Sequence, residues 1–245
     1  MRLIADLHTH SVASGHSYST IQEMFAEAAN KGLQALAITD HGPAMPGGPH
    51  IYHFGNMRVL PVQFLGIRLL KGVEANVVDR EGNLDMPEIY LQKLDIVLAG
   101  MHDLVTPCGS VEENTATMLK VMGNPFVDVI VHPGNPAYNV DYEKVLETAK
   151  DYGIAIEINN SSLCGSRKGS KENCHNIARL AAKKGNIVSI GTDAHFAPDV
   201  GRFDEAMEVV AEAGIKEEQV LNSSLKRILS YLTGRRAQRL GGVSK

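Results

Sequence analysis

The sequence predicts an α/β fold in which seven parallel strands, covered by helices, close or nearly close into one barrel. Short apolar, β-branched segments alternate with longer amphipathic segments along most of the chain. The short segments are apolar on both faces, which is typical of a parallel sheet covered by helices. No break in composition divides the chain, so we expect one domain over residues 1–245. An open, doubly wound sheet is the alternative, because periodicity does not show whether a sheet closes.

The elements follow from local patterns along the chain. The predicted strands are Leu3–His8, Leu36–Thr39, Leu69–Val78, Asp95–Ala99, Val127–Val131, Ile154–Ile158 and Ile187–Gly191. Apolar residues at helical spacing predict helices over Ile21–Lys31, Val111–Met122, Tyr142–Tyr152 and Lys171–Lys184. The first helix has Thr20 near its N-cap and Gly32 at its C-terminal end.

Two segments depart from this alternation. Gly42–Pro61 is rich in Gly and Pro and too long for a plain connection, so it is a candidate lid or substrate loop. Its histidines His50 and His53 could orient a substrate or act as acids, and ordinary loop roles are equally open. From about residue 219 we expect a surface helix ending in a solvated basic tail, since no acidic residue follows Glu218. The basic residues there are Lys226, Arg227, Arg235, Arg236, Arg239 and Lys245.

Composition excludes several classes of protein. The formal net charge of −4, the aromatic content of 5% and the lack of Trp argue against binding of long nucleic acid. No apolar run approaches the ~20 residues of a membrane span, and Asp6 lies where a signal peptide would be apolar. Three cysteines without C-x-x-C spacing indicate neither a disulfide framework nor a thiolate zinc site. We therefore expect a cytoplasmic protein.

The histidines carry the functional signal. Six of the seven predicted strands deliver His, Asp or Glu at the C-terminal end, where parallel α/β folds build their active sites. Alternation along the first strand places Asp6, His8 and His10 on one face. A single strand-end histidine is usually a hydrogen-bonded core residue, but so many buried together would be costly unless they bind something. His-x-His and Asp-x-His suit Zn²⁺, Mn²⁺ or Fe²⁺, so we expect a multinuclear metal centre. Its candidate ligands are His8, His10, His16, His41, Glu74, His102, His132, Asp193 and His195.

A charge count points to a reaction class. Nine ligands with one bridging carboxylate fit three divalent ions, which leave a residual charge of about +4, or about +3 with a bridging hydroxide. A phosphate monoester dianion matches that charge better than a neutral amide or sugar. Metal-bound hydroxide can be the nucleophile, so no separate protein base is required.

These residues resemble the polymerase-and-histidinol-phosphatase (PHP) superfamily. The matching motifs are His8-Thr9-His10, Thr39-Asp40-His41, Glu74, His102, His132-Pro133 and Asp193-Ala194-His195. Segments around His50, His53 and Arg58, with Asn159-Asn160-Ser161 and Ser166–Ser170, are similar to its small stand-alone bacterial phosphatases. The resemblance implies a distorted (β/α)₇ TIM-like barrel with a trinuclear zinc centre. It implies that His8, His10, Glu74 and Asp193 hold one ion, that Glu74, His102 and His132 hold the second, and that His16, His41 and His195 hold the third.

The expected function is a metal-dependent phosphatase acting on a small phosphorylated substrate. Candidate contacts to the phosphate oxygens are Arg58, Arg167 and Lys168. The alternatives are a phosphodiesterase or 3′–5′ nuclease acting on short nucleic acid, and a non-catalytic metal-binding regulatory protein. The sequence does not select the substrate, the metal or the oligomeric state, and a homo-oligomer is compatible with it.

Overall fold

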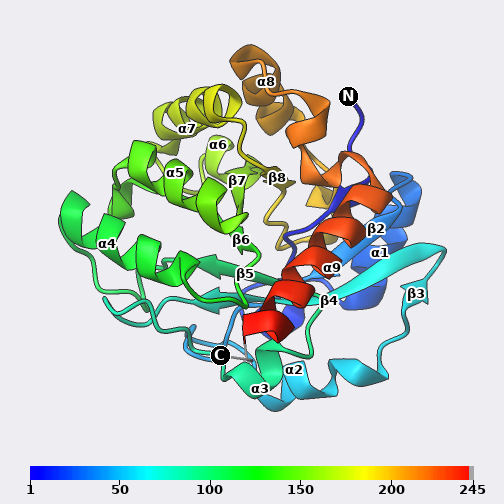
Figure 1. The fold of residues 1–245 in the computed structure, drawn as a ribbon. Coiled ribbons are helices and arrows are strands. Elements are labelled where there is room, and N and C mark those ends of the chain that lie inside the picture. Colours follow the sequence, from blue (N-terminus) through cyan, green and yellow to red (C-terminus); the bar gives the residue numbers. More distant parts are fainter. Residues whose placement is uncertain (243–245) are drawn as a thin grey trace.

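Seven parallel strands run in chain order around a barrel in the computed structural model, which describes residues 1–242 (Figure 1). The strands are β1 (Ala5–Asp6), β2 (Ala35–Ile38), β4 (Ile67–Asn76), β5 (Ile96–Gly100), β6 (Val129–Ile130), β7 (Ala155–Asn159) and β8 (Val188–Gly191). Each overlaps a predicted strand. The short strand β3 (Gln63–Phe64) was not predicted, and it forms a hairpin with β4, paired antiparallel.

The barrel is nearly closed where its first and last strands meet. No regular ladder joins β8 to β1 within the described residues, but Thr9 and Ala194 form a parallel bridge at the C-terminal end of the strands. Below it, Asn222 accepts the backbone N–H of Ile190 at 3.1 Å and donates to the carbonyl oxygens of Ala5 and Ile190 at 2.9 and 2.8 Å. The Asn222 amide therefore replaces the missing backbone hydrogen bonds between β8 and β1. The prediction of a barrel is confirmed, and the alternative of an open sheet is wrong.

Helices cover the outside of the barrel (Figure 1). They are α1 (Ile21–Asn30), α4 (Val111–Met122), α5 (Tyr142–Tyr152), α7 (Ser170–Lys184) and α8 (Asp204–Ala213), with the short helices α2 (Tyr52–Asn56), α3 (Glu88–Leu91) and α6 (Asn160–Leu163) in loops. Capping boxes begin α1 at Thr20 and α4 at Ser110. The sequence prediction omitted α8 and the three short helices. The segment Gly42–Pro61, expected to be a loop, contains α2.

Two apolar cores hold the layers together. The larger lies between the strands and the outer helices, and Phe25, Leu36 and Val97 belong to it. The smaller fills the barrel, where Ala37, Leu70 and other inward-facing strand residues pack with Leu221, Ile228 and Leu232. Helix α9 (Leu225–Gly242) contributes Ile228 and Leu232, so it covers one end of the barrel and leaves the other end for the strand-end side chains.

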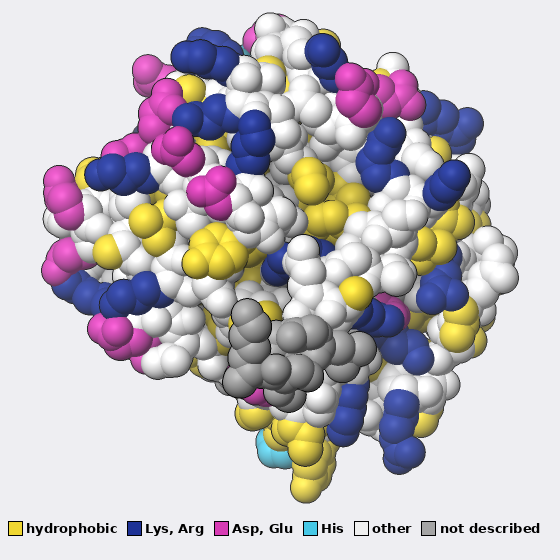
Figure 2. All heavy atoms as spheres, in the orientation of Figure 1, with side chains coloured by type: hydrophobic (Ala, Val, Ile, Leu, Met, Phe, Trp, Pro, Cys, Tyr) yellow, Lys and Arg dark blue, Asp and Glu magenta, His cyan; other side chains and the backbone are white. Residues whose placement is uncertain are grey.

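The expectation of a solvated basic tail was wrong for two of its arginines. Arg239 and Arg235 are each only 7% exposed. Arg239 pairs with the buried carboxylate of Asp128 at 2.5 Å, and Arg235 donates to the carbonyl oxygens of Tyr152 and Val127 at 2.7 and 2.6 Å. Both arginines therefore pair with groups inside the protein. On the face drawn in Figure 2, acidic side chains are interspersed among the Lys and Arg side chains. Lys245 lies outside the described residues.

No helix within residues 1–242 is both long enough and apolar enough to cross a membrane.

Candidate metal centre

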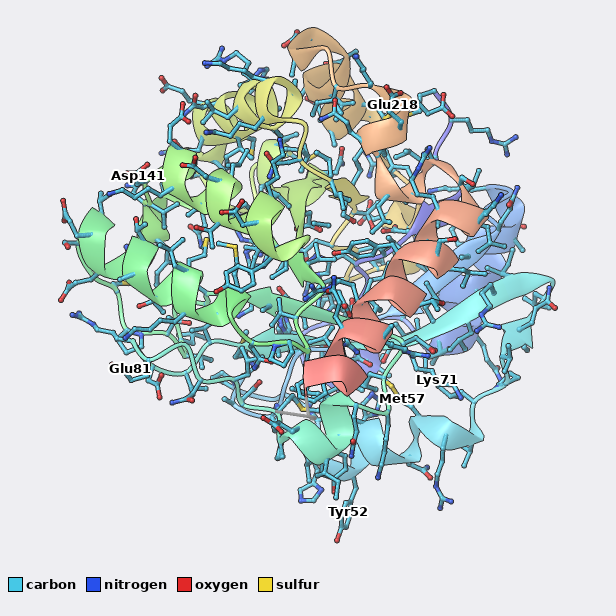
Figure 3. All side chains as sticks on the ribbon, in the orientation of Figure 1. Tyr52, Met57, Lys71, Glu81, Asp141 and Glu218 are labelled. Atoms are coloured by element: carbon cyan, nitrogen blue, oxygen red, sulfur yellow. The ribbon has the colours of Figure 1, made fainter. Side chains whose placement is uncertain are left out.

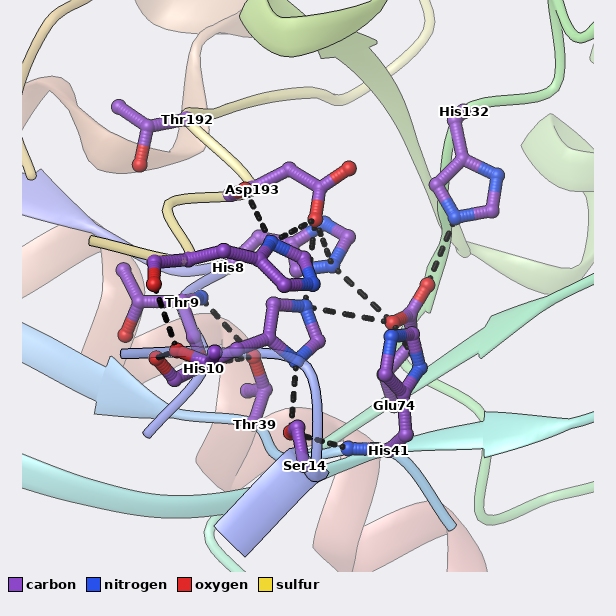
Figure 4. A network of polar contacts seen from close by, with 12 residues as sticks. His8, Thr9, His10, Ser14, Thr39, His41, Glu74, His132, Thr192 and Asp193 are labelled. Atoms are coloured by element: carbon purple, nitrogen blue, oxygen red, sulfur yellow. Dashed lines mark hydrogen bonds and ion pairs between the residues drawn. The ribbon is translucent and has the colours of Figure 1, made fainter. Parts of the chain in front are cut away.

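The strand-end side chains converge on Glu74, which β4 carries into the open end of the barrel (Figure 4). Its Oε1 lies 2.7 Å from Nε2 of His132 and 3.0 Å from Nε2 of His102. Its Oε2 lies 2.8 Å from Nδ1 of His41 and 3.4 Å from Nε2 of both His8 and His10. One carboxylate thus has a different set of imidazoles on each oxygen, which is the arrangement of a bridging ligand.

The loop after β8 supplies the rest of the cluster. Asp193 Oδ1 lies 3.2 Å from Nε2 of His10 and 3.6 Å from Nε2 of His8. His195 and His16 face each other with their Nε2 atoms 3.1 Å apart. The structure therefore brings together all nine side chains that the sequence singled out as ligands.

Neighbouring acceptors fix the ring protons of three histidines. Nδ1 of His8 donates to Glu157 Oε1 at 2.8 Å, and Nδ1 of His195 donates to the carbonyl oxygen of Asp193 at 2.9 Å. Ser14 uses its only proton on Asp40 at 2.8 Å, so it accepts from Nδ1 of His10 at 3.2 Å. With Nδ1 protonated, Nε2 of each ring keeps its lone pair for a cation.

The residues present fit a metal ion. Within the described residues, His8 Nε2, His10 Nε2, His41 Nδ1 and Glu74 Oε2 are buried yet make no hydrogen bond. Buried nitrogen and carboxylate lone pairs without donors are costly. Ligand atoms of His8, His10 and Asp193 lie within 4.8 Å of one another, as do those of His10, His41 and His195 and those of His41, Glu74 and His102. Imidazole with carboxylate is the donor set that Zn²⁺, Mn²⁺ and Fe²⁺ accept.

Several candidate ligands are held in the protonation state that a cation requires. Burial lowers the pKa of His10 well below its ordinary value, and burial with the nearby Arg167 lowers that of His132 to about 4. Although burial opposes ionisation of Glu74, the field of the surrounding imidazoles lowers its pKa well below the usual range. His8 differs: burial disfavours its charged form, but Glu157, Glu74 and Asp193 outweigh burial and raise its pKa.

Comparison with known proteins identifies the family. A model described as the PHP domain matches residues 6–130. A probable phosphatase of Thermoanaerobacter sp. (strain X514) is 52% identical over 243 residues, covering 99% of each chain. One from Caldanaerobacter subterraneus subsp. tengcongensis is 53% identical, covering 99% of this chain and 95% of that protein. The chain belongs to the PHP domain family.

Solved structures show that the PHP fold extends over most of the chain. The histidinol phosphate phosphatase of Lactococcus lactis, complexed with zinc, L-histidinol and phosphate, aligns with a TM-score of 0.67 at 18% identity, over 88% of this chain and 95% of that one. A putative histidinol phosphatase from Listeria monocytogenes aligns with a TM-score of 0.59 at 15% identity, over 81% of this chain and 97% of that one. Together with the family match and the relatives of 52% and 53% identity, this similarity of fold confirms the resemblance seen in the sequence.

Positive backbone φ angles and glycines make room for the candidate ligands of this PHP domain. His132 and Asp193 have positive φ angles of 34° and 57°, a conformation that costs a non-glycine residue about 1–3 kcal/mol. A Cβ on Gly191 would collide with Glu157, and one on Gly100 would lie 2.8 Å from His132 Cε1. Around the clustered imidazoles, the backbone is therefore strained at His132 and Asp193, and glycines occupy two positions where a Cβ would not fit.

The predicted substrate contacts have different positions. A pocket of about 810 Å³ opens over the candidate metal centre. Arg167 and Lys168 line it, together with five of the candidate ligands: His16, His41, His102, Asp193 and His195. Arg167 donates to Asp193 Oδ2 at 3.0 Å and to Ser162 Oγ at 3.2 Å. Arg58 instead lines a separate pocket of about 770 Å³ beside α2 and α3, none of whose lining residues is a candidate ligand. The structure does not bring Arg58 to the centre.

The residues that orient the candidate ligands include Glu157, which the sequence did not single out. Glu157 accepts from His8 and, through Oε2, from the backbone N–H of His132 at 2.8 Å and the amide of Asn159 at 3.0 Å. A carboxylate inside the apolar strand Ile154–Ile158 was a visible signal, since a buried charge requires partners. Asp6, which shares the predicted strand Leu3–His8 with His8, accepts instead from Thr192 Oγ1 at 2.5 Å and helps to join the two ends of the barrel.

Proposed function

We propose that this PHP domain is a metal-dependent phosphatase that hydrolyses a small phosphomonoester with a trinuclear, zinc-type centre. His8, His10, Glu74 and Asp193 would hold one ion, Glu74, His102 and His132 a second, and His16, His41 and His195 a third. Manganese or iron would suit the same donors. Two carboxylates among nine ligands leave the loaded centre strongly positive, as a dianionic monoester requires.

One observation carries the proposal: the buried lone pairs around Glu74 have no donor in the described residues and face a common space. The curated relatives similar to this chain over nearly their whole length are named probable phosphatases, which supports the same reaction class.

The chain's own residues bind the substrate and hold the ligands. Bound divalent ions supply Lewis acidity and lower the pKa of water toward neutrality. Arg167, itself 18% exposed, keeps one guanidinium nitrogen on Asp193 and can direct others toward a phosphate in the pocket. Lys168 adds a second positive charge at the same wall. Glu157 and Ser14 keep the Nδ1 protons of His8 and His10 in place, so that those rings do not rotate when the substrate arrives.

The test compares two chromogenic esters with Zn²⁺- and Mn²⁺-loaded protein. We expect kcat/KM for p-nitrophenyl phosphate to exceed that for bis-p-nitrophenyl phosphate, because the diester carries one charge fewer and a second bulky group. In the Arg167→Ala/Lys168→Ala variant, KM for the monoester should rise about tenfold or more, the effect of losing charge-assisted hydrogen bonds. Because Arg167 also contacts Asp193, KM should rise more than metal content falls.

The matched control is Arg58→Ala, which removes an arginine from the other pocket and should leave KM unchanged. Faster cleavage of the diester or of single-stranded DNA would favour the phosphodiesterase or nuclease alternative. Stable metal binding without hydrolysis of any phosphorylated metabolite would favour a non-catalytic role.

A further inference from the structure

A buried carboxylate lies behind the candidate ligands from β1 and β2. Asp40 is fully buried. Its Oδ1 accepts from the Ser11 backbone N–H at 2.7 Å and from Ser14 Oγ at 2.8 Å, and its Oδ2 accepts from Ser11 Oγ at 2.9 Å. These donors all belong to the segment that follows β1 and carries His10 and His16.

Ser14 connects Asp40 to two candidate ligands through hydrogen bonds. Its oxygen accepts from Nδ1 of His10 at 3.2 Å and from the backbone N–H of His41 at 3.2 Å (Figure 4). Because the Ser14 proton is used on Asp40, both contacts depend on the carboxylate staying where it is.

The fourth donor to Asp40 comes from a different part of the chain. Nε2 of His53, on α2, lies 3.0 Å from Asp40 Oδ2. Because a carboxylate only accepts, Nε2 of His53 carries the proton. With this bond, the four acceptor positions of Asp40 are filled. Figure 3 shows the neighbouring Tyr52 projecting outward from α2, whereas the His53 side chain is only 24% exposed.

We propose that His53 is a positioning residue of the metal centre, acting through Asp40 and Ser14 on His10 and His41. The inference rests on the proposed function, since it concerns the centre that performs it. It also gives the Gly42–Pro61 segment a defined role, because α2 brings an imidazole N–H to a buried carboxylate that the ligand loops alone leave with one open position. Without that bond, Asp40 can turn, Ser14 loses its fixed donor direction, and the His10 ring loses its orientation.

The experiment measures Zn²⁺ affinity of the full chain by competition with a chromogenic chelator, together with the Tm of the metal-free protein. We expect His53→Leu to weaken binding of at least one ion by ten- to hundredfold, the usual effect of losing an outer partner of a ligand. His53→Gln, whose amide can donate to Asp40, should recover most of that loss. His50→Ala is the matched control, since His50 is on the same segment, is exposed and does not contact Asp40.

A double-mutant cycle tests the route. If His53 acts through Asp40, then Asp40→Asn combined with His53→Leu should bind Zn²⁺ no more weakly than Asp40→Asn alone. Additive losses would overturn that route. A His53→Leu variant with a lower metal-free Tm and unchanged Zn²⁺ affinity would show a merely structural role. Failure of the unmodified protein to bind Zn²⁺ in the same titration would instead contradict the proposed function.

Discussion

At the scale of single residues, Glu74 contacts five imidazoles that four different strands deliver. A terminal ligand such as His16 meets the cluster from one side, whereas the two oxygens of Glu74 face different partners. Its negative charge would also lie between two of the proposed cations, and at such short range that charge screens their repulsion.

Glu74→Gln should therefore remove at least one metal ion and most phosphatase activity, while the barrel still folds. The amide keeps the size of the side chain but not its charge, so the loss reports on metal binding rather than on packing. Elemental analysis and circular dichroism of gently purified protein measure the two effects. If the variant kept its metal content and turnover, Glu74 on β4 would not be a ligand of the centre.

At the scale of elements, α9 closes the end of the barrel opposite the candidate metal centre. Asp128, just before β6, accepts from the Val97 N–H at 2.9 Å and pairs with Arg239. Arg236, on the exposed side of the same helix, pairs with Asp95 at 2.8 Å. One helix therefore offers a buried and a solvated arginine–aspartate pair for direct comparison.

Arg239→Ala should destabilise the protein by up to about 3–5 kcal/mol, because it removes the cation that hydrogen-bonds the buried Asp128 carboxylate and leaves only Arg235 Nε, 3.6 Å from the same oxygen. Arg236→Ala should cost less than about 1 kcal/mol, as expected for an exposed pair. Urea unfolding of both variants measures the free energies. Equal losses would mean that α9 is held by its apolar side chains alone.

Local signals explain which elements the sequence predicts. The bounds of α4 and α5 agree with the structure because Ser110 and Asp141 cap them and because their apolar spacing is regular. The candidate ligands could be picked out because most of them lie directly at a strand end, and the structure brings their side chains together. Arg239, by contrast, donates to groups more than 100 residues away, and no pattern near it in the sequence names those partners. The same holds for Glu157 and His53, whose roles depend on contacts that only the folded chain creates.

At the scale of the whole molecule, the candidate ligands extend from residue 8 to residue 195 and join the least regular part of the barrel. His8 and Asp193 lie on the two sides of the β8–β1 junction, where a bridge and the Asn222 side chain replace a ladder. Bound ions would therefore stabilise the closure of the barrel as well as serve in catalysis.

Chelation should accordingly lower the Tm, and the effect should grow between pH 6 and pH 8. Ions at 1,000 times their Kd add about 4 kcal/mol per site to the folded state. The raised pKa of His8 means that its protonated form stabilises the metal-free fold at low pH and that this stabilisation is lost as pH rises through the raised pKa. Ions must displace that proton, so they bind more weakly at pH 6. Calorimetry with and without chelator at several pH values measures the fall in Tm on chelation and its increase with pH. Equal Tm values with and without chelator at every pH would contradict the proposal that bound ions stabilise the closure of the barrel.

The junction of β8 with β1 also sets an order of events during synthesis. The chain is synthesised from its N-terminus, so His8 and His10 are made first and Asp193 and His195 are added more than 180 residues later. The proposed sites that use these residues are complete only once β8 has been made, whereas Glu74, His102 and His132 are all present by residue 132. A nascent chain can thus offer the ligands of one proposed site early, but it acquires the full set only when β8 meets β1.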